Sequence, residues 1–500
     1  MHPPRSLILV TIDCLRADHI GFLGYTASTT PFLDTLAPES CVFKNAVAAG
    51  TPTYYSLPAI LASRYPLALG RDTIGIAPGE STLASALNDF GYQTAAFIAA
   101  NPYLSRRFGY DLGFAEFQDF LGGDEASASA VWNDPESTTL RTRANREIAR
   151  FCHAGGPLGA AYDELYFHYC QKARAGETKS LDFLRKFPSA DVIVDHAICW
   201  LTGNAGRPVF LWLHLMDPHA PYFPKETALG ELGCGHLDAD QAKYLNAWWG
   251  RSDLDARRLQ KKRDQVIALY DAGIRWVDSQ IHRLCEALVN LSLWSNCTLA
   301  ITADHGEEFL EHGGRFHPPI NLHQETVHVP LLLRTPEPGN AWSVDQPFSL
   351  IDLAPTLLDS LGIPWPADFR GRSCWRDLQH GSNWNRAAIT ECVRGCTNPL
   401  HPETRNAPRI LAVRGGTYKL VFDFATGKEE LFDLESDSTE QNALPADACR
   451  QIRRDLLAQA QKHIAESRKS RNLERRIAAQ IRELLAGWAV AAKGVPNWAA

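Results

Sequence analysis

The residues that suggest chemistry most directly stand at the end of one apolar run. The run 297–303 is mostly apolar and of strand length, and Asp304, His305 and Gly306 follow it at once. A buried parallel strand delivers polar groups in this way to the carboxyl edge of an open sheet. A carboxylate beside an imidazole suits a divalent metal ion. The alternative is turn chemistry, since Asp and Gly are common turn residues.

Three further apolar runs also end in a polar side chain. The first is followed by Asp13, the second by Asn101, and the third runs into His214. Because the carboxyl ends of parallel strands meet at one edge of a sheet, the four runs predict a common site. Two carboxylates and an imidazole favour Zn²⁺ or Mn²⁺ over Ca²⁺, which prefers oxygen ligands throughout. One or two divalent ions are therefore expected as cofactors.

The elements that would hold such a site alternate along the chain. The apolar runs that predict strands are 7–12, 91–100, 208–213, 297–303 and 329–334. Segments with helical apolar spacing lie among them, at 30–37, 57–66, 82–90, 191–201, 266–288 and 348–361. This alternation predicts an α/β fold with a large, mostly parallel sheet flanked by helices.

The pattern changes near residue 380. Short runs at 387–392, 410–414, 418–423 and 430–434 predict a smaller C-terminal antiparallel sheet. Three parts are therefore expected, namely a catalytic α/β domain over 1–380, a sheet subdomain over 381–445 and a helical, basic tail over 446–500. Within the first, residues 119–190 are interpreted as an insertion that lines or caps a substrate pocket.

Composition excludes several classes of partner. Lys and Arg number 50 against 57 Asp and Glu, a net charge of −7, so no nucleic-acid partner is expected. No apolar run approaches membrane-spanning length, and no membrane association is expected. The 12 cysteines lack CxxC spacing and favour reduced thiols over a disulfide framework. We expect a cytoplasmic protein that binds a small ester substrate, and oligomers are left open.

Several motifs, in order over about residues 6 to 440, together carry a family resemblance. They are Asp13-x-x-Arg16-x-Asp18-His19-x-Gly21, Thr53-x-x-Ser56 before Leu61-x-x-Arg64-Tyr-Pro66, His214-x-x-Asp217-Pro-His219-Ala-Pro-Tyr, Asp304-His305-Gly-Glu-Glu, Val329-Pro-Leu-Leu, Asp352-Leu-Ala-Pro-Thr and Glu430-Leu-Phe-Asp-Leu. This ensemble resembles the sulfatase branch of the alkaline phosphatase superfamily. The resemblance implies a metal-dependent hydrolase or transferase acting on phosphate or sulfate esters, with a large α/β domain and a small C-terminal sheet domain.

The resemblance also implies roles for single residues. Asp13, Asp304 and His305 look like ligands of the principal metal. Thr53 stands where the family places its nucleophile, which is itself a metal ligand. Thr51 and Ser56 are the alternative nucleophiles within the same loop.

Four more polar residues resemble groups that act on the substrate. His219 and His317 look like the pair that binds the transferred group or a second metal, so they are catalytic candidates. Asn101 and His214 are weaker candidates, for substrate binding. Glu307 and Glu308 either orient the metal ligands or belong to a solvated helix start.

The chain departs from the sulfatase pattern at the nucleophile. True sulfatases have a Cys/Ser-x-Pro-Ser-Arg motif, whose first residue is oxidised to formylglycine. Here the corresponding positions hold Thr53, Tyr55, Ser56 and Leu57. Threonine cannot become that aldehyde, and the arginine is missing. Threonine does occur in the nucleotide pyrophosphatases and phosphoethanolamine transferases of the superfamily.

Further departures surround the metal site. Cys14 replaces a second acid, and the Lys and His that sulfatases carry after the second strand appear as Ala99 and Asn101. These differences favour a phosphoesterase that cleaves phosphate mono- or diesters, or phosphonate esters, through a metal-bound Thr53 and a covalent phospho-enzyme. The alternatives are a sulfuric ester hydrolase without formylglycine, a phosphotransferase, and a pseudoenzyme that binds metal and anion.

Overall fold

The computed structural model describes residues 5–68, 74–122, 164–165, 180–337, 341–394 and 409–467. The chain divides into two compact units, each built from separate segments. The first comprises Met1–Asn45, Ala84–His317 and His328–Asp345, and the second Ala46–Leu83, Pro318–Val327 and Gln346–Ala500. The contiguous domain boundaries expected at 380 and 445 stay a prediction.

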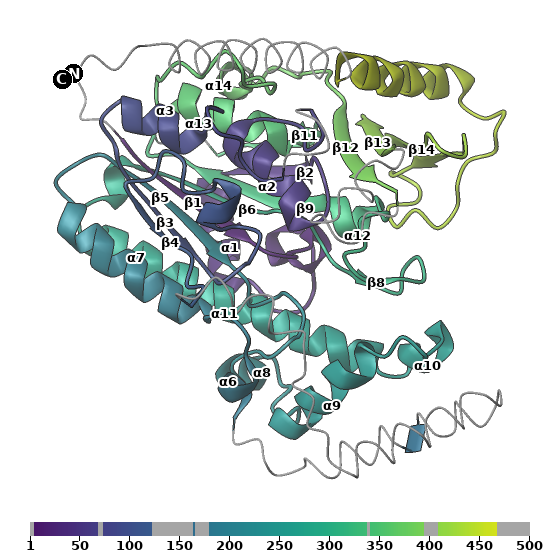
Figure 1. Ribbon diagram of the computed structural model, residues 1–500, viewed down its shortest axis with the longest axis horizontal. Coiled ribbons are helices and arrows are strands. Elements are labelled where there is room, and N and C mark those ends of the chain that lie inside the picture. Colours follow the sequence, from purple (N-terminus) through teal and green to yellow (C-terminus); the bar gives the residue numbers. More distant parts are fainter. Residues whose placement is uncertain are drawn as a thin grey trace, which may run out of the picture. The chain divides into compact units, whose positions relative to one another are not determined.

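A mostly parallel sheet organises the first unit (Figure 1). Its strands follow the order β10-β2-β9-β6-β1-β5-β3-β4. Their bounds are β1 (Ser6–Ile12), β2 (Cys41–Val47), β3 (Gln93–Ile98), β4 (Glu116–Gln118), β5 (Val209–Leu215), β6 (Cys297–Ala303), β9 (His328–Arg334) and β10 (Ser343–Val344). β1 pairs in parallel with both β5 and β6, whereas β9 runs antiparallel to β6. The predicted fold class is therefore confirmed.

The three central strands explain why their sequences are continuously apolar. Every residue of β1, β5 and β6 is buried, as in sheets covered on both faces. The register sets Ile12 beside Leu215 on one flank and Ala303 on the other. Asp13 and Asp304, the next residues along β1 and β6, therefore leave the sheet at the same level.

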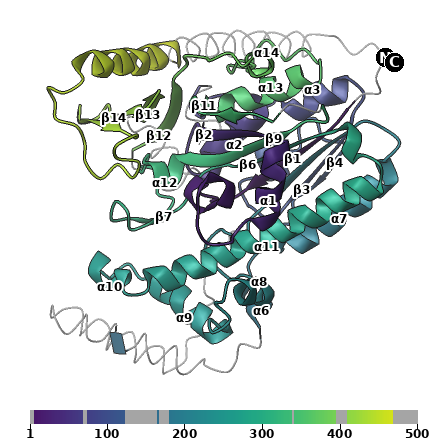
Figure 2. The same ribbon diagram turned by 180° about the vertical axis from the view of Figure 1, so that it is seen from behind.

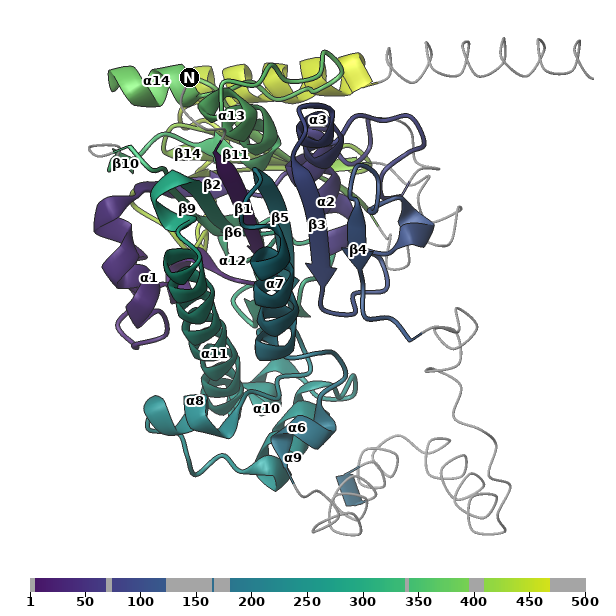
Figure 3. The ribbon, with the colours of Figure 1, turned by 90° about the vertical axis from the view of Figure 1, so that its left-hand side faces the viewer.

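Two long helices, α7 (Ala190–Asn204) and α11 (Arg263–Asn290), lie side by side along one face of this sheet (Figures 1 and 3). α1 (Pro31–Leu36) packs against α11, where the Asp278 carboxylate accepts the backbone N–H groups of Phe32 and Leu33, each at 2.9 Å. Shorter elements complete the unit, namely α3 (Leu83–Asp89), α6 (Leu181–Leu184), α8 (Glu226–Glu231), α9 (Ala239–Trp249), α10 (Ala256–Gln260), β7 (Glu308–Phe309) and β8 (Arg315–Phe316).

The second unit contains a four-stranded antiparallel sheet, β12 (Ala388–Val393), β13 (Arg409–Gly415), β14 (Tyr418–Asp423) and β15 (Glu429–Asp433), paired in that order. A helix over residues 450–467 covers one face (Figure 2). Leu411 and Val413 of β13 pack toward this helix, whereas Ile410 and Ala412 join a core on the other face. This alternation confirms the small antiparallel sheet and the C-terminal helix predicted from the sequence.

A fully buried helix, α2 (Thr53–Ala62), also belongs to the second unit. It packs against η6 (Leu350–Asp352) and α13 (Leu353–Ser360), and the remaining short elements are β11 (Phe348–Ser349), α12 (Gln324–Val327) and α14 (Trp375–His380). The helix predicted at 57–66 begins four residues earlier, because Pro52 accepts the N–H groups of Tyr55 and Ser56. It ends earlier too, at the left-handed Ser63 (φ 47°).

One strand was not predicted from the sequence, and some predictions fall on residues that the structure does not describe. The strand β2 was not predicted, since Lys44 and Asn45 interrupt its apolar pattern. Most of the 119–190 insertion and the part of the predicted basic tail after residue 467 lie outside the described residues. In the part of the chain that the structure describes, no helix combines the length and the apolar composition needed to cross a bilayer.

A buried charge cluster in the second unit links strand β12 to strand β13, to the C-terminal helix and to the segment that follows α2. Glu391 of β12 is fully buried, and its carboxylate contacts His463 Nε2, Arg409 Nη1 at 3.5 Å and the backbone N–H of Leu67 at 3.0 Å. Burial alone would raise the pKa of this carboxyl. The charges of Arg409 and His463 outweigh it and lower the pKa from 4.5 to about 2.

Glu391→Gln should lower the free energy of unfolding by about 3–5 kcal/mol at neutral pH, because it leaves buried cations without their partner. Since the folded-state pKa of Glu391 lies below its ordinary value, its contribution is complete above pH 4.5 and is lost as pH falls toward 2. Urea unfolding at several pH values measures both effects, and the variant should lose stability less steeply in acid than the wild type.

Glu429→Gln is the matched control. The carboxylate of Glu429 pairs with Arg453 at 2.7 Å but is partly exposed, so its loss should cost less than about 1 kcal/mol. Equal losses in the two variants, or an unchanged acid dependence in Glu391→Gln, would show that the Glu391 cluster is not a specific stabilising contact.

Candidate active site

Two fully buried carboxylates face each other where β1 and β6 end. The Asp304 Oδ1 atom accepts the backbone N–H of its neighbour His305 at 2.9 Å and that of Cys14 at 3.3 Å. Asp13 and Asp304 are both 0% exposed. Burying two carboxylates together is costly unless cations or hydrogen-bond donors compensate them.

The ring of His305 adds a third acceptor to this pair. Its Nδ1 lies 2.8 Å from the Gly306 carbonyl oxygen, which can only accept, so Nδ1 carries a proton. Nε2 lies 3.7 Å from Asp13 Oδ1 and 3.5 Å from Asp304 Oδ2. Either Nε2 is also protonated or a cation lies among these three atoms. Two carboxylates and an imidazole nitrogen at this spacing fit a divalent metal ion.

Asn101 and His214 contact the other oxygen of Asp13. The Asn101 amide donates to Asp13 Oδ2 at 3.1 Å, and His214 Nε2 lies 3.2 Å from the same atom. His214 is inside β5, and its Nδ1 is 2.9 Å from the hydroxyl of Thr11, which itself donates to the Leu213 carbonyl. Both side chains are thus placed to orient Asp13.

The electrostatics around Asp13 favour its charged form. Burial alone would raise the pKa of this carboxyl, but the charges of His219, His305 and His214, with the hydrogen bond from His214, hold it well below its ordinary value. A carboxylate that stays ionised in a dry site is an effective ligand for a cation.

Cys14 brings a thiol into the same site. Its Sγ lies 3.1 Å from Asp13 Oδ1 and 3.4 Å from His317 Nδ1. Burial, with the nearby charges of Glu307 and Asp13, raises the pKa of this thiol well above its ordinary value. The sequence marked Cys14 only as a departure from the family pattern, although its place directly after Asp13 was a signal of proximity.

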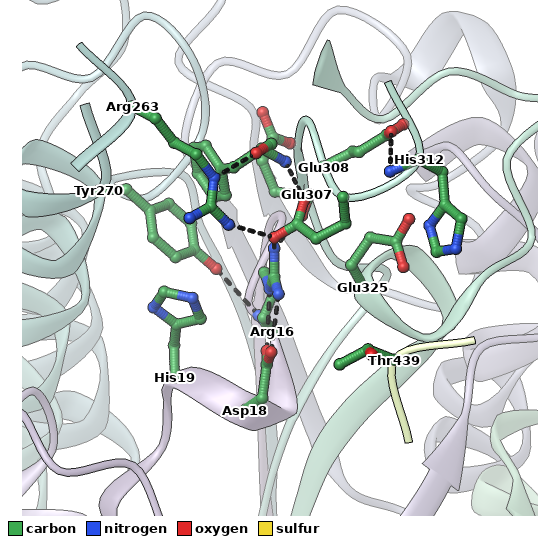
Figure 4. Close-up of polar contacts among 12 residues, drawn as sticks. Arg16, Asp18, His19, Arg263, Tyr270, Glu307, Glu308, His312, Glu325 and Thr439 are labelled. Atoms are coloured by element: carbon green, nitrogen blue, oxygen red, sulfur yellow. Dashed lines mark hydrogen bonds and ion pairs between the residues drawn. The ribbon is translucent and has the colours of Figure 1, made fainter. Parts of the chain in front are cut away.

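The loop after β1 is braced by α11 and by Arg16 (Figure 4). Tyr270 donates from its hydroxyl to the Cys14 carbonyl at 2.8 Å and accepts the Arg16 N–H at 3.0 Å. The Arg16 guanidinium donates to Asp18, to Glu311 and to the Glu307 carbonyl. These contacts hold Cys14 in a left-handed conformation (φ 61°), which a residue with a side chain adopts only at a cost. Arg16 and Asp18 are therefore structural supports.

Two partly buried histidines stand beside these candidate ligands. His219 follows β5 and His317 follows β8, and their ring centroids are 5.1 Å apart. The His317 ring is also 4.7 Å from that of His305. His219 Nδ1 contacts the Ala220 carbonyl, so Nε2 is the ring nitrogen left to exchange a proton with a bound group. The structure thus brings both predicted histidines to the site.

Glu307 and Glu308 are buried, so the solvated helix start considered for them is wrong. The Glu307 carboxylate lies 2.8 Å from His317 Nδ1 and accepts the Tyr222 hydroxyl at 2.5 Å. Burial acts to raise its pKa, but the charge and hydrogen bond of His317 lower it below its ordinary value. Glu308 instead accepts the backbone N–H groups of His312 and Gly314, and so ties the turn between β7 and β8.

The nucleophile candidates lie in the second unit. Thr53 is the first residue of α2 and is 4% exposed, and Thr51 and Ser56 are both 0% exposed. The hydroxyl of Thr51 has no hydrogen-bond partner among the described residues. Since the amino end of a helix carries a partial positive charge, the place of Thr53 suits chemistry on an anion.

A family model described as Sulfatase matches residues 5–363, most of the chain. The chain belongs to the sulfatase family. A second model, described as N-sulphoglucosamine sulphohydrolase, C-terminal, matches residues 312–469 of this sulfatase-family chain. The resemblance drawn from the motifs is thereby confirmed.

The relatives of this sulfatase-family protein are named for different activities. The multifunctional alkaline phosphatase superfamily protein PehA of Trinickia caryophylli is 22% identical over 89% of this chain and 91% of its own. An arylsulfatase of Clostridium perfringens is 23% identical over 87% and 89%. The phosphonate monoester hydrolase of Agrobacterium radiobacter shares the fold, with a TM-score of 0.61 at 20% identity over 93% and 96% of the two chains.

Family membership and these relatives make the chain a hydrolase of the alkaline phosphatase superfamily. Members of this superfamily are metal-dependent, usually on divalent ions. The facing acceptor atoms of Asp13, Asp304 and His305 agree with that requirement in this chain.

If Asp13 and Asp304 hold the divalent ion, its removal should lower the thermal stability of the protein, because the ion would offset the repulsion between the two carboxylates. Treatment with a chelator should lower Tm, and Zn²⁺ or Mn²⁺ should restore it; an ion at 100 times its Kd stabilises by about 2.7 kcal/mol. Differential scanning calorimetry measures the shift.

Asp304→Asn should remove most of this response. Asp278→Asn is the control. Asp278 is also buried, but its carboxylate accepts hydrogen bonds from backbone N–H groups of α1 and lies outside the site. A Tm response in Asp304→Asn as large as in the wild type would contradict the assignment of Asp304 as a ligand.

Proposed function

We propose that this sulfatase-family hydrolase cleaves phosphate mono- or diesters, or phosphonate esters, with Thr53 as its nucleophile. The observation that carries the proposal is a threonine in the family's nucleophile position, together with the buried ligand cluster of Asp13, Asp304 and His305. Threonine cannot form the formylglycine on which sulfatases depend. The PehA relative and the phosphonate monoester hydrolase fold also support a phosphorus ester.

The first half of the reaction forms a covalent intermediate. A bound divalent ion would lower the pKa of the Thr53 hydroxyl and neutralise charge on the transferred group. Thr53 Oγ1 forms a bond to phosphorus as the bond from phosphorus to the leaving oxygen breaks. His219 or His317 supplies a proton to that oxygen, and the hydroxyl proton of Thr53 passes to solvent. The product alcohol leaves, and phospho-threonine remains.

The second half restores the enzyme. Water attacks the phosphorus, the bond to Thr53 Oγ1 breaks, and the hydroxyl regains a proton as phosphate or phosphonate departs. The histidine that gave a proton to the leaving oxygen is then ready to accept one from this water. The positive end of α2 would stabilise the equatorial oxygens in both halves.

Neighbouring side chains fix the orientation of Asp13 and of His317. Asn101 and His214 share Asp13 Oδ2, which directs the other oxygen toward His305. Glu307 orients His317 as a carboxylate orients a ligating or catalytic imidazole. We therefore assign Asn101 and His214 to positioning Asp13, in addition to the substrate contact expected for them.

A sulfate ester is the second candidate substrate. The matching family models and the Clostridium arylsulfatase favour it, because they are named for sulfate chemistry. With Thr53 as nucleophile the same steps would pass through a sulfo-threonine, without formylglycine. The metal ligands serve both reactions, so the nucleophile and the substrate assay decide between them.

The test compares wild type and Thr53→Ala on aryl phosphate monoesters, phosphodiesters, phosphonate monoesters and sulfates. Loss of the nucleophile should lower kcat/KM by roughly 10³–10⁶-fold, and Thr53→Ser should retain activity. Quenched reactions analysed by mass spectrometry should show phosphate on the peptide that contains Thr53. Faster turnover of sulfates than of every phosphorus ester would favour the second candidate.

Thr51→Ala and Ser56→Ala are the matched comparisons, since each removes a neighbouring hydroxyl. Both should keep most of the activity. If Thr51→Ala alone is inactive while Thr53→Ala turns over normally, the nucleophile is Thr51 and the proposed role of Thr53 is wrong.

A further inference from the structure

We propose that a cavity in the second unit is a separate binding site for a small organic molecule that carries a phosphate or sulfate group. The cavity has a volume of about 500 Å³, which lies within the range of small-molecule sites. The segment after α2, the start of η6, the loops before α14 and β12, and the helix over 450–467 form its wall. The inference goes beyond the proposed function and does not depend on Thr53.

The cavity lies at the end of α2 opposite to Thr53. Thr53 is the first residue of this helix, whereas Tyr65 follows its last residue, Ala62, and lines the cavity. The ten residues of α2 span roughly 15 Å. A molecule bound beside Tyr65 is therefore too far from the Thr53 hydroxyl to be the group that Thr53 attacks.

The wall of the cavity carries more positive than negative charge. Four arginine and lysine side chains line it against two carboxylates, namely Arg370, Arg372, Arg386 and Lys462 against Asp352 and Glu466. Asp352 is already compensated, since it accepts the backbone N–H of Arg372 at 2.7 Å and pairs with Arg386 at 3.4 Å. His463 also lines the cavity, but its Nε2 atom contacts Glu391. The excess of positive charge favours an anionic ligand.

Two of the cations are available to such a ligand. The guanidinium of Arg372 makes no hydrogen bond or ion pair within the residues that the structure describes. A guanidinium presents its N–H donors in a planar fork, which matches two oxygens of a phosphate or sulfate group. The Lys462 ammonium lies 3.9 Å from Glu466, beyond hydrogen-bond distance, and its side chain is 76% exposed. Both side chains can therefore turn toward an anion.

A buried hydroxyl and a helix start add further donors. Ser349 is 5% exposed, and its Oγ atom forms no hydrogen bond among the described residues, although it lies near the Tyr65 hydroxyl. Ser349 directly precedes the helical stretch formed by η6 and α13, and its side chain does not cap that stretch. Because the first amides of a helix favour anions, an oxyanion placed here would meet both these amides and the Ser349 hydroxyl.

The apolar part of the wall favours an organic ligand over an inorganic ion. Ile351, Ala387 and Ile389 line the cavity together with Tyr65. Inorganic phosphate would leave this surface in contact with water, whereas an organic group attached to the anion would cover it. Charge therefore selects the phosphate or sulfate group, and the apolar wall selects the group that carries it.

The competing explanation is that the cavity holds only water and that its cations are solvated. Isothermal titration calorimetry of the full-length protein with phenylphosphonate separates the two, because this probe joins a tetrahedral anion to a ring and has no ester bond to cleave. The wild type should bind it roughly tenfold more tightly than inorganic phosphate. Equal affinities would overturn the assignment to an organic ligand, and absence of binding would overturn the site.

Arg372→Glu should weaken phenylphosphonate binding by roughly tenfold or more, because it places a like charge beside the anion. Arg376→Glu is the matched control, since Arg376 is exposed on α14 and does not line the cavity. It should bind the probe as the wild type does. An equal loss in both variants, or no loss in Arg372→Glu, would overturn the site.

Ala387→Phe tests the cavity without a change of charge, because the larger side chain occupies the space of the ring. It should also weaken binding, while kcat/KM on aryl esters stays unchanged in this variant and in Arg372→Glu. If binding and turnover fall together, the probe occupies the active site and the separate site is wrong. If the wild type cleaves no ester but Arg372→Glu still loses the probe, only the proposed function is refuted.

Discussion

The site depends on the parallel pairing of β1 with β6, which places Asp13 and Asp304 at one level, with a carboxylate oxygen of each within 4.8 Å of the other. Burying two carboxylates side by side is costly, and the backbone amide of Cys14, the Asn101 amide and the His214 imidazole around them offset that cost. The rest of the first unit serves this arrangement. Strands buried on both faces keep the register rigid, and α11 reaches over the edge with Tyr270 to hold the first loop. Two carboxylates held this close would favour a bound cation between them, and the surrounding fold supplies the stability that permits the arrangement.

Much of the fold was predictable because the strands that matter most are buried on both faces. Such strands are continuously apolar, and the polar residue that ends each run stands out against them. For this reason the sequence could predict that Asp13, Asp304 and His305 lie together, as the structure shows. Strand β2 could not, since only part of it is buried and Lys44 interrupts it. The start of α2 was placed late, because the carbonyl of Pro52 captures the first amides in a way that apolar spacing does not reveal.

The residues that sequence reasoning undervalued depend on loop conformation. Cys14 enters the site through a left-handed backbone held by a tyrosine about 250 positions away in the chain. Glu307 lies in the loop after β6, and only tertiary contacts turn its carboxylate inward to Tyr222 and His317. Local pattern carries no information on contacts of this range. The candidate metal ligands, by contrast, directly follow regular strands, and this explains why the two groups of residues differed in predictability.

The antiparallel return of β9 has a consequence for how this enzyme can diverge. Because β9 pairs with β6 in the opposite direction, the chain after Ala303 leaves the sheet and comes back to it at the same edge. No crossover constrains the residues in between, and doubling the length of such a loop costs only about 0.6 kcal/mol in closure entropy. Asp304 and His305 directly follow β6, whereas His317 lies in the segment between β6 and β9. Changes in the length of the segment between β6 and β9 would therefore alter where His317 stands without displacing Asp304 and His305 from the end of β6.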